Sequence, residues 1–221
     1  MKNKLILSLT IICAALVGII TINISASSEE IANKTQNINK NENIVFLGDS
    51  IFDWYPTDKI FSDLPVVNSG ICGNTTNDIL ENMEERVYKY NPTKVFLNIG
   101  TNDIEYDDSD ELNEEVANNI IKITENILRN RKKSKVYIIS IYPVNNNMSA
   151  AHDRHNSEME EINSKLSSYC TSKENVEYID AYNQLLDNEG MLDEAYTKDG
   201  LHPNDLGYAK LTEIFMKYMY Q

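Results

Sequence analysis

Five short hydrophobic segments are spaced along the chain, and each has the composition of a strand buried on both faces. Most are rich in β-branched residues and run nearly without polar interruption, a pattern typical of the interior of a parallel sheet. The segments are Ile44 to Leu47, Val66 to Asn68, Val95 to Ile99, Val136 to Ile141 and Val176 to Ile179. We therefore predict a mostly parallel, five-stranded sheet.

The segments between these strands carry apolar residues at helical spacing. Helices are predicted for Thr75 to Tyr90 with Thr75 as N-cap, Glu111 to Arg131, Ser157 to Ser168, and the segment after Pro203, with Leu211, Ile214, Phe215 and Tyr218 buried in the last. Alternating strands and helices predict a three-layer α/β/α sandwich. In such a fold the active site lies at the carboxyl ends of the strands.

The amino terminus has the pattern of an export signal. Lys2 and Lys4 precede an apolar run over residues 5–22, and Ile24-Ser25-Ala26 resembles a cleavage site. Residues 1–26 are therefore predicted to be a signal peptide, or an uncleaved anchor that tethers the protein to a membrane through residues 5–22. Either alternative makes the protein exported, at the cell surface or secreted. Residues 27–43 form a polar linker in this interpretation, and residues 44–221 form one domain.

Composition narrows the choice of partners. The chain has 221 residues, of which 42% are hydrophobic, so it can bury a core. Its net charge of −14 argues against binding to nucleic acid, which requires a basic surface. Cys72 and Cys170 are the cysteines that follow the export segment. We expect two small buried thiols rather than a disulfide framework, although their spacing leaves a pairing open. Nothing in the composition indicates an oligomeric state.

Four polar motifs follow predicted strands. They are Gly48-Asp49-Ser50, a loop containing Gly73, Gly100-Thr101-Asn102-Asp103, and Asp199-Gly200-Leu201-His202. Taken singly, each reads as an ordinary turn or helix start, and the last could begin a helix with Pro203 at its first position. Together they fall at one edge of the predicted sheet, where side chains distant in sequence can meet.

These motifs resemble the four blocks of the SGNH hydrolases, also called GDSL-type esterases and lipases, over almost all of the predicted domain. The resemblance implies a flavodoxin-like α/β fold with Ser50 as nucleophile, His202 as base and Asp199 as its orienting acid. It also implies an oxyanion hole formed by Ser50, Gly73 and Asn102, and it implies no metal and no cofactor. Ile51 departs from the leucine of the family motif, without an expected functional cost.

The chemistry agrees with these residue types. A serine hydroxyl needs a base to take its proton, and the resulting oxyanion needs preorganised N–H donors. The predicted function is hydrolysis of carboxylic esters through an acyl-enzyme, with short acyl groups on a carbohydrate, cell-wall or lipid substrate. Three alternatives stay open: a lysophospholipase or thioesterase for longer chains, a non-catalytic glycan-binding domain, and a metal-dependent phosphoesterase. The chain lacks the early Asp-x-His of such phosphoesterases, and it lacks the Gly-x-Ser-x-Gly of α/β-hydrolases.

Several other residues near the motifs have two interpretations. Asp49 and Asp103 are expected to hold the strand-end loops through backbone hydrogen bonds. Aromatic residues after the first and fourth strands, namely Trp54, Tyr55 and Tyr142, either line an acyl or sugar pocket or pack in the core. The histidines at 152 and 155, with an aspartate between them, suggest a metal site, but a solvated loop is the simpler interpretation because no further ligands cluster with them.

Overall fold

The computed structural model describes residues 42–104, 109–151 and 154–220. It contains one five-stranded parallel sheet in the order β2-β1-β3-β4-β5. The strands are β1 (Ile44–Gly48), β2 (Val66–Gly70), β3 (Lys94–Asn98), β4 (Lys135–Ile139) and β5 (Val176–Ile179). Each lies within two residues of a predicted strand, so the prediction of a parallel α/β sheet is confirmed. The predicted export segment and most of the linker lie outside the described residues.

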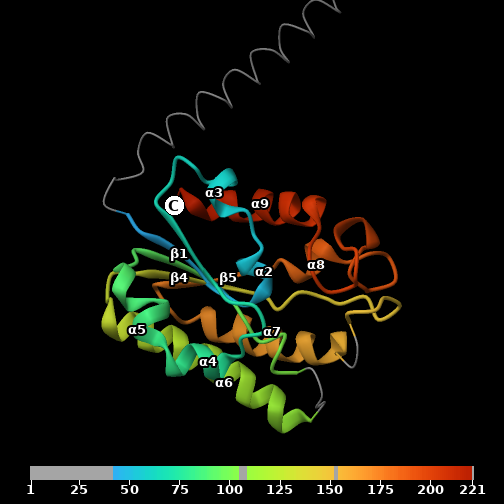
Figure 1. The fold of residues 1–221 in the computed structure, drawn as a ribbon. Coiled ribbons are helices and arrows are strands. Elements are labelled where there is room, and N and C mark those ends of the chain that lie inside the picture. The colour runs from blue at the N-terminus through green and yellow to red at the C-terminus, as the bar shows by residue number, and fades with distance from the viewer. Residues whose placement is uncertain (1–41, 105–108, 152–153, 221) are drawn as a thin grey trace, which may run out of the picture. The chain divides into compact units, whose positions relative to one another are not determined.

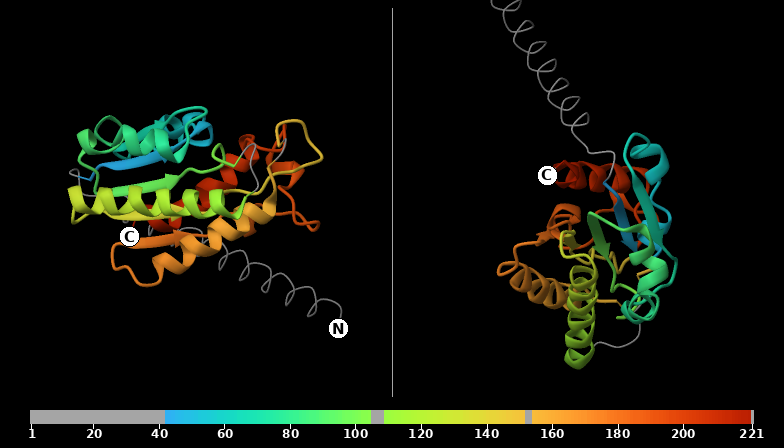
Figure 2. Two further views of the ribbon diagram at one scale, coloured as in Figure 1. Left: turned by 90° about the horizontal axis from the view of Figure 1, so that it is seen from below. Right: turned by 90° about the vertical axis from the view of Figure 1, so that its left-hand side faces the viewer.

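Helices cover both faces of the sheet (Figure 1). They are α2 (Ser50–Asp53), α3 (Thr57–Ile60), α4 (Thr76–Glu81), α5 (Met83–Arg86), α6 (Asp110–Asn130), α7 (Asn156–Cys170), α8 (Tyr182–Leu185) and α9 (Asp205–Met219), with 3₁₀ turns η1 (Tyr88–Tyr90) and η2 (Glu194–Tyr196). Helices α4 to α7 lie on one face and α3 and α9 on the other, and Figure 2 shows the sheet between them. The described residues contain no helix long and apolar enough to cross a membrane.

The two faces of the sheet have different cores. Toward α4 to α7 the strands contribute aliphatic residues such as Val45 and Leu97, which belong to one buried cluster with Ile120 of α6. Toward α9 they contribute aromatic rings, with Phe96 stacked between Phe46 at 4.9 Å and Tyr137 at 4.7 Å between ring centroids. Alternate residues of a strand point to opposite faces, so one continuous apolar run supplies both layers.

The predicted helix over 75–90 is broken into α4, α5 and η1. Thr75 caps α4 as predicted, through a reciprocal capping box with Asp78. Asn82 ends the helix because its side-chain amide donates to the carbonyl of Asp78 at 2.9 Å, while its backbone N–H bonds to Ile79. A side chain that competes for a helical carbonyl weakens the helix. The short helices α2, α3 and α8 were not predicted.

The carboxyl-terminal helix begins after Pro203, as predicted, but one of its expected buried residues needs correction. The helix starts at Asp205, because the side chain of Asn204 caps it by accepting from Leu206 and Gly207 at 2.9 and 3.0 Å, so the alternative with Pro203 at the first helical position is wrong. Met219 is buried at its end, whereas Tyr218 is only partly buried.

The sheet order creates a switch point. From β1 the chain passes to β2 on one side, and from β2 it crosses to β3 on the other side of β1. The loops that leave β1 and β3 therefore diverge at their carboxyl ends, and such divergence opens a crevice that α/β proteins use for ligands. Ser50 follows β1 and Asn102 follows β3 at this point.

Candidate active site

Ser50, His202 and Asp199 form a hydrogen-bonded chain, although Ser50 and His202 are 152 positions apart in the sequence. Ser50 is the first residue of α2, and its Oγ lies 3.1 Å from His202 Nε2. His202 Nδ1 lies 2.8 Å from Asp199 Oδ2. Hydroxyl, imidazole and carboxylate are thus within hydrogen-bond distance of one another in that order, an arrangement that can support acyl transfer.

The Asp199 carboxylate is held by its own loop. Its Oδ1 accepts the backbone N–H groups of Leu201 at 2.9 Å and His202 at 2.8 Å. Gly200 has a φ of +91°, and a β-carbon there would lie 2.6 Å from the carbonyl oxygen of Asn145, so this tight turn requires glycine. The loop therefore presents Oδ2 to the imidazole in a fixed direction.

The ionisation of Asp199 fixes the tautomer of His202. Partial burial raises the pKa of Asp199, but hydrogen bonds from the His202 ring and from the loop backbone lower it further, and the net pKa falls below its ordinary value. An ionised carboxylate only accepts hydrogen bonds. Nδ1 therefore carries the proton, and Nε2 is left to accept a proton from Ser50.

The loop carrying Gly73 lies beside the start of α2. The backbone N–H groups of the two residues before Gly73 bind back to this region, Ile71 to the carbonyl of Gly48 at 3.1 Å and Cys72 to Oδ2 of Asp53 at 3.3 Å. Gly73 has a φ of +77° with open space where a β-carbon would lie. The position thus favours glycine for its backbone conformation rather than for close packing.

Asn102 and Gly73 are brought together through Asn74. Asn102 Nδ2 donates to the carbonyl of Asn74 at 3.0 Å. The buried Arg154 contacts Asn102 Oδ1 at 3.5 Å and donates from Nε to the carbonyl of Thr101 at 2.8 Å. The amide is therefore oriented with its oxygen toward Arg154 and its NH₂ toward the Gly73 loop, and one N–H of that NH₂ remains to meet an oxyanion.

A second buried arginine, Arg86, ties the same loop to the sheet. Its Nη2 donates to the carbonyls of Gly48 at 2.9 Å and Ser69 at 2.5 Å, and its Nη1 contacts Asn74 Oδ1. One guanidinium thus links the carboxyl ends of β1 and β2 to the residue after Gly73. Sequence reasoning did not identify Arg86, Arg154 or Asn74, since a buried arginine carries no motif that separates it from a solvated one.

Two buried aspartates support these loops, as predicted. Asp49 Oδ1 caps α2 by accepting from Ile51 N at 2.9 Å, and the Asp103 carboxylate accepts from the N–H of Thr76 at 3.0 Å. Burial raises the pKa of Asp49 to about 7 and that of Asp103 to about 6. Asp49 Oδ2 is buried with no hydrogen-bond partner in the described part of the chain.

The three aromatic residues that could line a pocket or pack in the core differ in their exposure. Trp54 is half exposed, and its ring centroid lies 4.3 Å from that of His202. Tyr55 and Tyr142 are buried and pack in the core. Cys72 is exposed and Cys170 is buried, and both are free, so the expectation of two buried thiols is wrong for Cys72, which lies in the Gly73 loop.

Only one of the two histidines considered as metal ligands lies within the described residues. Residues 152 and 153 lie outside the described residues, and His155 is exposed at the start of α7, where it forms a capping box with Glu158. In the ranges that the structure covers, no group of three or more histidine, cysteine or acidic side chains could hold a metal ion.

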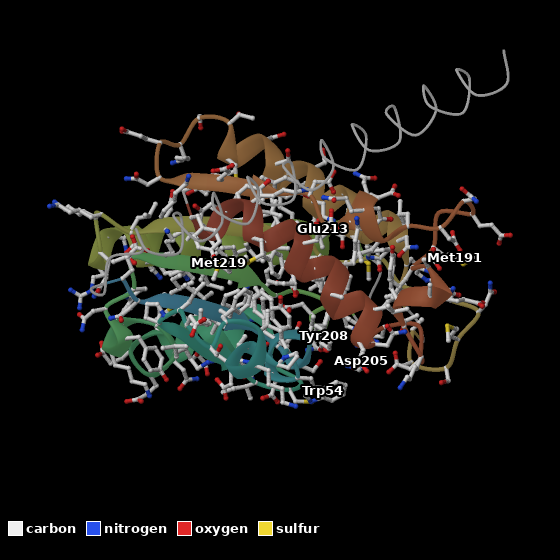
Figure 3. The ribbon with its side chains drawn as sticks, turned by 90° about the horizontal axis from the view of Figure 1, so that it is seen from above. Trp54, Met191, Asp205, Tyr208, Glu213 and Met219 are labelled. Carbon is white, nitrogen blue, oxygen red and sulfur yellow. The ribbon has the colours of Figure 1, made fainter. Side chains whose placement is uncertain are left out.

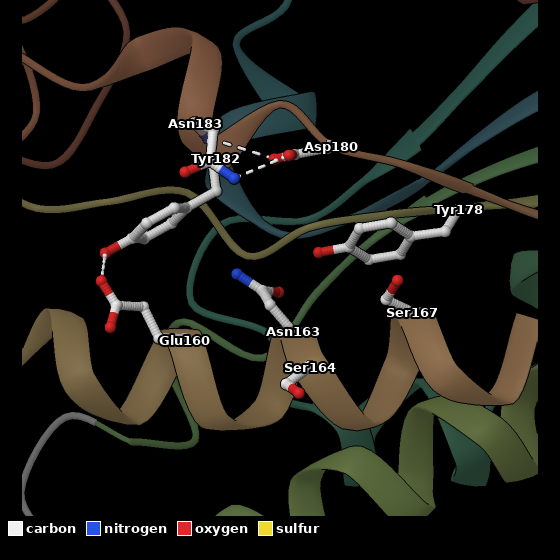
Figure 4. Close-up of a pocket in the computed structure, with 8 residues that line it drawn as sticks. All are labelled: Glu160, Asn163, Ser164, Ser167, Tyr178, Asp180, Tyr182 and Asn183. Carbon is white, nitrogen blue, oxygen red and sulfur yellow. Dashed lines mark hydrogen bonds between the residues drawn. The ribbon is translucent and has the colours of Figure 1, made fainter.

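A hollow of about 280 Å³ lies between α7, the end of β5 and α8 (Figure 4). Its lining is polar, and Tyr182 donates to Glu160 across it at 2.9 Å. It shares no residue with the cluster around Ser50 and is therefore separate from that site.

Comparison with known proteins finds solved structures with the same fold. A Streptococcus pneumonia structure described as a platelet activating factor is 31% identical, with a TM-score of 0.74 over 93% of this chain and 98% of that one. A Bacteroides fragilis acylhydrolase (23% identical, TM-score 0.72, 86% and 93% covered) and an acetylxylan esterase from Geobacillus stearothermophilus (21%, 0.62, 81% and 94%) have the same fold.

A curated relative matches only in part. The N-acylneuraminate cytidylyltransferase of Escherichia coli O18:K1:H7 is 34% identical over 172 residues, which are 76% of this chain but 38% of that protein. This chain therefore spans less than half of the length of that relative. The family model of the GDSL-like Lipase/Acylhydrolase family matches residues 46–210, and the chain belongs to that family.

Proposed function

We propose that this protein is a serine esterase that hydrolyses carboxylic esters through an acyl-enzyme, with Ser50, His202 and Asp199 as its catalytic residues. The observation that carries the proposal is the 3.1 Å contact between Ser50 Oγ and His202 Nε2, with Asp199 on the far ring nitrogen at 2.8 Å. Membership of an acylhydrolase family supports the same reaction class.

The first half of the reaction forms the acyl-enzyme. Ser50 Oγ attacks the carbonyl carbon while His202 Nε2 takes its proton, and Asp199 stabilises the imidazolium. The carbonyl oxygen becomes an oxyanion that receives N–H groups from Ser50, Gly73 and Asn102. Collapse of this intermediate breaks the bond to the alcohol oxygen, which takes the proton from Nε2 and leaves.

The second half regenerates the enzyme. Water gives a proton to His202 Nε2 as it attacks the acyl carbon on Ser50. A second oxyanion forms at the same donors and collapses, and Ser50 Oγ takes the proton back as the carboxylic acid departs. Every proton therefore passes through one imidazole nitrogen, and the reaction consumes only ester and water.

A covalent probe tests the assignment most directly. A fluorophosphonate should label Ser50, and Ser50→Ala should abolish both labelling and turnover of p-nitrophenyl acetate while leaving the circular dichroism spectrum unchanged. Ser164→Ala, which alters an exposed serine of α7, is the matched control for labelling. Activity of Ser50→Ala equal to wild type would remove Ser50 from its role, and an unlabelled, inactive wild type would favour a glycan-binding domain.

We propose short acyl groups on carbohydrate, cell-wall or lipid alcohols as the substrates. The domain has no long apolar insertion that could cover a long chain. Comparison of p-nitrophenyl acetate, butyrate and palmitate should give the highest kcat/KM for acetate or butyrate. A preference for palmitate would favour a longer-chain lysophospholipase or thioesterase.

We also propose that the protein is exported, with residues 1–26 as a signal peptide or membrane anchor. Fractionation of cells that produce the full chain should place the activity outside the cytoplasm. Amino-terminal sequencing of the product distinguishes cleavage from anchoring.

A further inference from the structure

One exposed apolar side chain, that of Trp54, lies against His202, and another, that of Leu206, follows His202 closely in the chain. Among the described residues, the large hydrophobic side chains with substantial exposure are Trp54, Ile60, Ile71 and Leu206. Trp54 lies against the His202 ring, and Leu206 lies in the first turn of α9, four positions after His202. Isolated exposed apolar residues are ordinary, but a cluster that adjoins a reactive site indicates a surface for ligands.

A groove lies between α3 and α9, close in the chain to Trp54 and Leu206. It has a volume of about 350 Å³, and its lining is mainly apolar: Pro56, Ile60, Asp205, Tyr208, Ala209 and Thr212. Trp54 stands two positions before Pro56, and Tyr55 between them stacks on Tyr208 with 5.2 Å between ring centroids, so the segment of Trp54 packs against α9 (Figure 3). We call Trp54, Leu206 and this groove the apolar shelf.

Reaction chemistry decides which half of an ester reaches the apolar shelf. The carbonyl oxygen must point toward the donors of Gly73 and Asn102, in the loops after β2 and β3. The alcohol oxygen must lie within hydrogen-bond reach of His202 Nε2 to take its proton. The carbon atoms attached to that oxygen then lie beside the group that adjoins the imidazole, which is the indole of Trp54.

We propose that the apolar shelf binds the alcohol half of the substrate, and that Trp54 determines which alcohols are accepted. This inference rests on the proposed esterase function. The ligand class is an uncharged alcohol with an apolar or ring-shaped face, because an indole offers a flat surface for such groups. Asp205 is the charged residue of the groove lining, so an anionic alcohol such as a sugar phosphate is disfavoured.

The test separates the alcohol from the acyl group. Cyclohexyl acetate and methyl acetate share an acyl group, whereas p-nitrophenyl acetate and butyrate share an alcohol. Trp54→Ala should lower kcat/KM for cyclohexyl acetate roughly tenfold, as expected for a lost apolar contact, and should change that for methyl acetate less than twofold. The acetate-to-butyrate ratio should stay within twofold of wild type, and Trp54→Phe should restore part of the loss.

Two controls keep the result specific. Leu128→Ala removes a partly buried apolar side chain of α6, on the face of the sheet opposite to α9, and should leave the cyclohexyl-to-methyl ratio unchanged. An acetylated methyl glucoside tests which kind of ring binds. If Trp54→Ala lowers kcat/KM for both ring esters, the apolar shelf binds rings in general. If kcat/KM falls for the glucoside alone, the shelf binds sugars.

Two outcomes would overturn the inference. Trp54→Ala could change the acetate-to-butyrate ratio instead, which would assign the apolar shelf to the acyl group. An equal loss on every ester would make Trp54 a support for His202 rather than a binding residue. In both cases the wild-type enzyme remains active, so the failure is distinct from a failure of the proposed function, in which wild type would hydrolyse none of the esters.

Discussion

The two sides of the Ser50 site differ in burial and polarity: buried charged groups hold one side, and exposed apolar side chains form the other. On the side of the loops after β2 and β3, which we call the donor side, Arg86 and Arg154 are 5% and 2% exposed and hold the loops through backbone carbonyls and asparagine side chains. On the other side, Trp54 and Leu206 of the apolar shelf are 51% and 62% exposed.

The difference follows from what each side must do. Stabilising an oxyanion requires donors that are already aimed before charge develops, and buried polar networks supply such rigidity at a cost in desolvation. Accepting an alcohol requires contact with a group whose shape varies, and an exposed apolar surface does this without a network. Substitutions on the donor side should therefore affect stability and kcat strongly, and substitutions on the apolar shelf should not.

The largest expected effect concerns Asp49, the buried residue that immediately precedes Ser50 in the chain. Its pKa is raised to about 7 in the folded protein against 3.8 for the ordinary carboxyl, so the folded state binds a proton more tightly than the unfolded state between these values. The free energy of unfolding therefore falls as pH rises from about 4 to about 7, by up to about 4 kcal/mol at roughly 1.4 kcal/mol per pKa unit.

Asp49→Asn should remove most of this fall, because the amide oxygen can still cap α2 and does not ionise. Urea unfolding at pH 4, 5.5, 7 and 8 measures it. Asp103 contributes to the fall in the same direction and interacts with Asp49, so the difference between wild type and variant contains Asp49 together with its coupling to Asp103. Asp58→Asn, at an exposed position of α3, is the control. Parallel pH profiles for wild type and Asp49→Asn would contradict the assignment.

Asn102→Ala removes a donor from the oxyanion site. We expect kcat for p-nitrophenyl acetate to fall about 100- to 1,000-fold, with KM changed much less, because the bond forms fully only in the transition state. Asn130→Ala, at the exposed end of α6, should have no effect on either parameter. A rise in KM at constant kcat would instead make Asn102 a ground-state binding residue.

Arg154 should act through Asn102. We expect Arg154→Met to lower kcat roughly tenfold, since the amide of Asn102 loses the partner that orients it, and Arg154→Lys to recover part of the loss. In the Asn102→Ala background the same substitution should cost less than twofold. Additive losses in this double-mutant cycle would show that Arg154 acts independently of Asn102.

The smallest effect is expected on the apolar shelf. Leu206→Ala should change the free energy of unfolding by less than about 0.5 kcal/mol, because the side chain is mostly in solvent. Leu211→Ala, on the buried face of the same helix, should cost about 2 to 5 kcal/mol. Thermal unfolding of the pair measures the contrast, and equal losses would mean that Leu206 is packed rather than exposed.

The sequence predicted the strands well because each is buried on both faces. Val95 and Phe96 serve different cores, yet both must be apolar, so the run is continuous and easy to locate. The break at Asn82 was missed because the apolar positions Ile79, Met83 and Val87 keep helical spacing through it. Helices of four residues such as α2 are shorter than any usable periodicity.

The residues of the site also include some that the sequence predicted and others that it did not. Ser50, Asp199 and His202 stand in short motifs, and the structure brings these three together. The groups that hold the oxyanion loops, above all Arg86 and Arg154, lie outside any motif. Their partners are backbone carbonyls, and a carbonyl is available at every position in a chain. The tertiary fold determines whether their guanidinium groups are buried, so no local sequence pattern indicates it.

Trp54 is the only tryptophan of the chain, and it lies against the imidazole of His202. Intrinsic fluorescence of this protein therefore originates at the site itself, without any label. An alcohol bound on the apolar shelf would change the surroundings of the indole, so a shift in its emission would report that the site is occupied. The protein thus carries its own optical reporter of ligand binding beside His202.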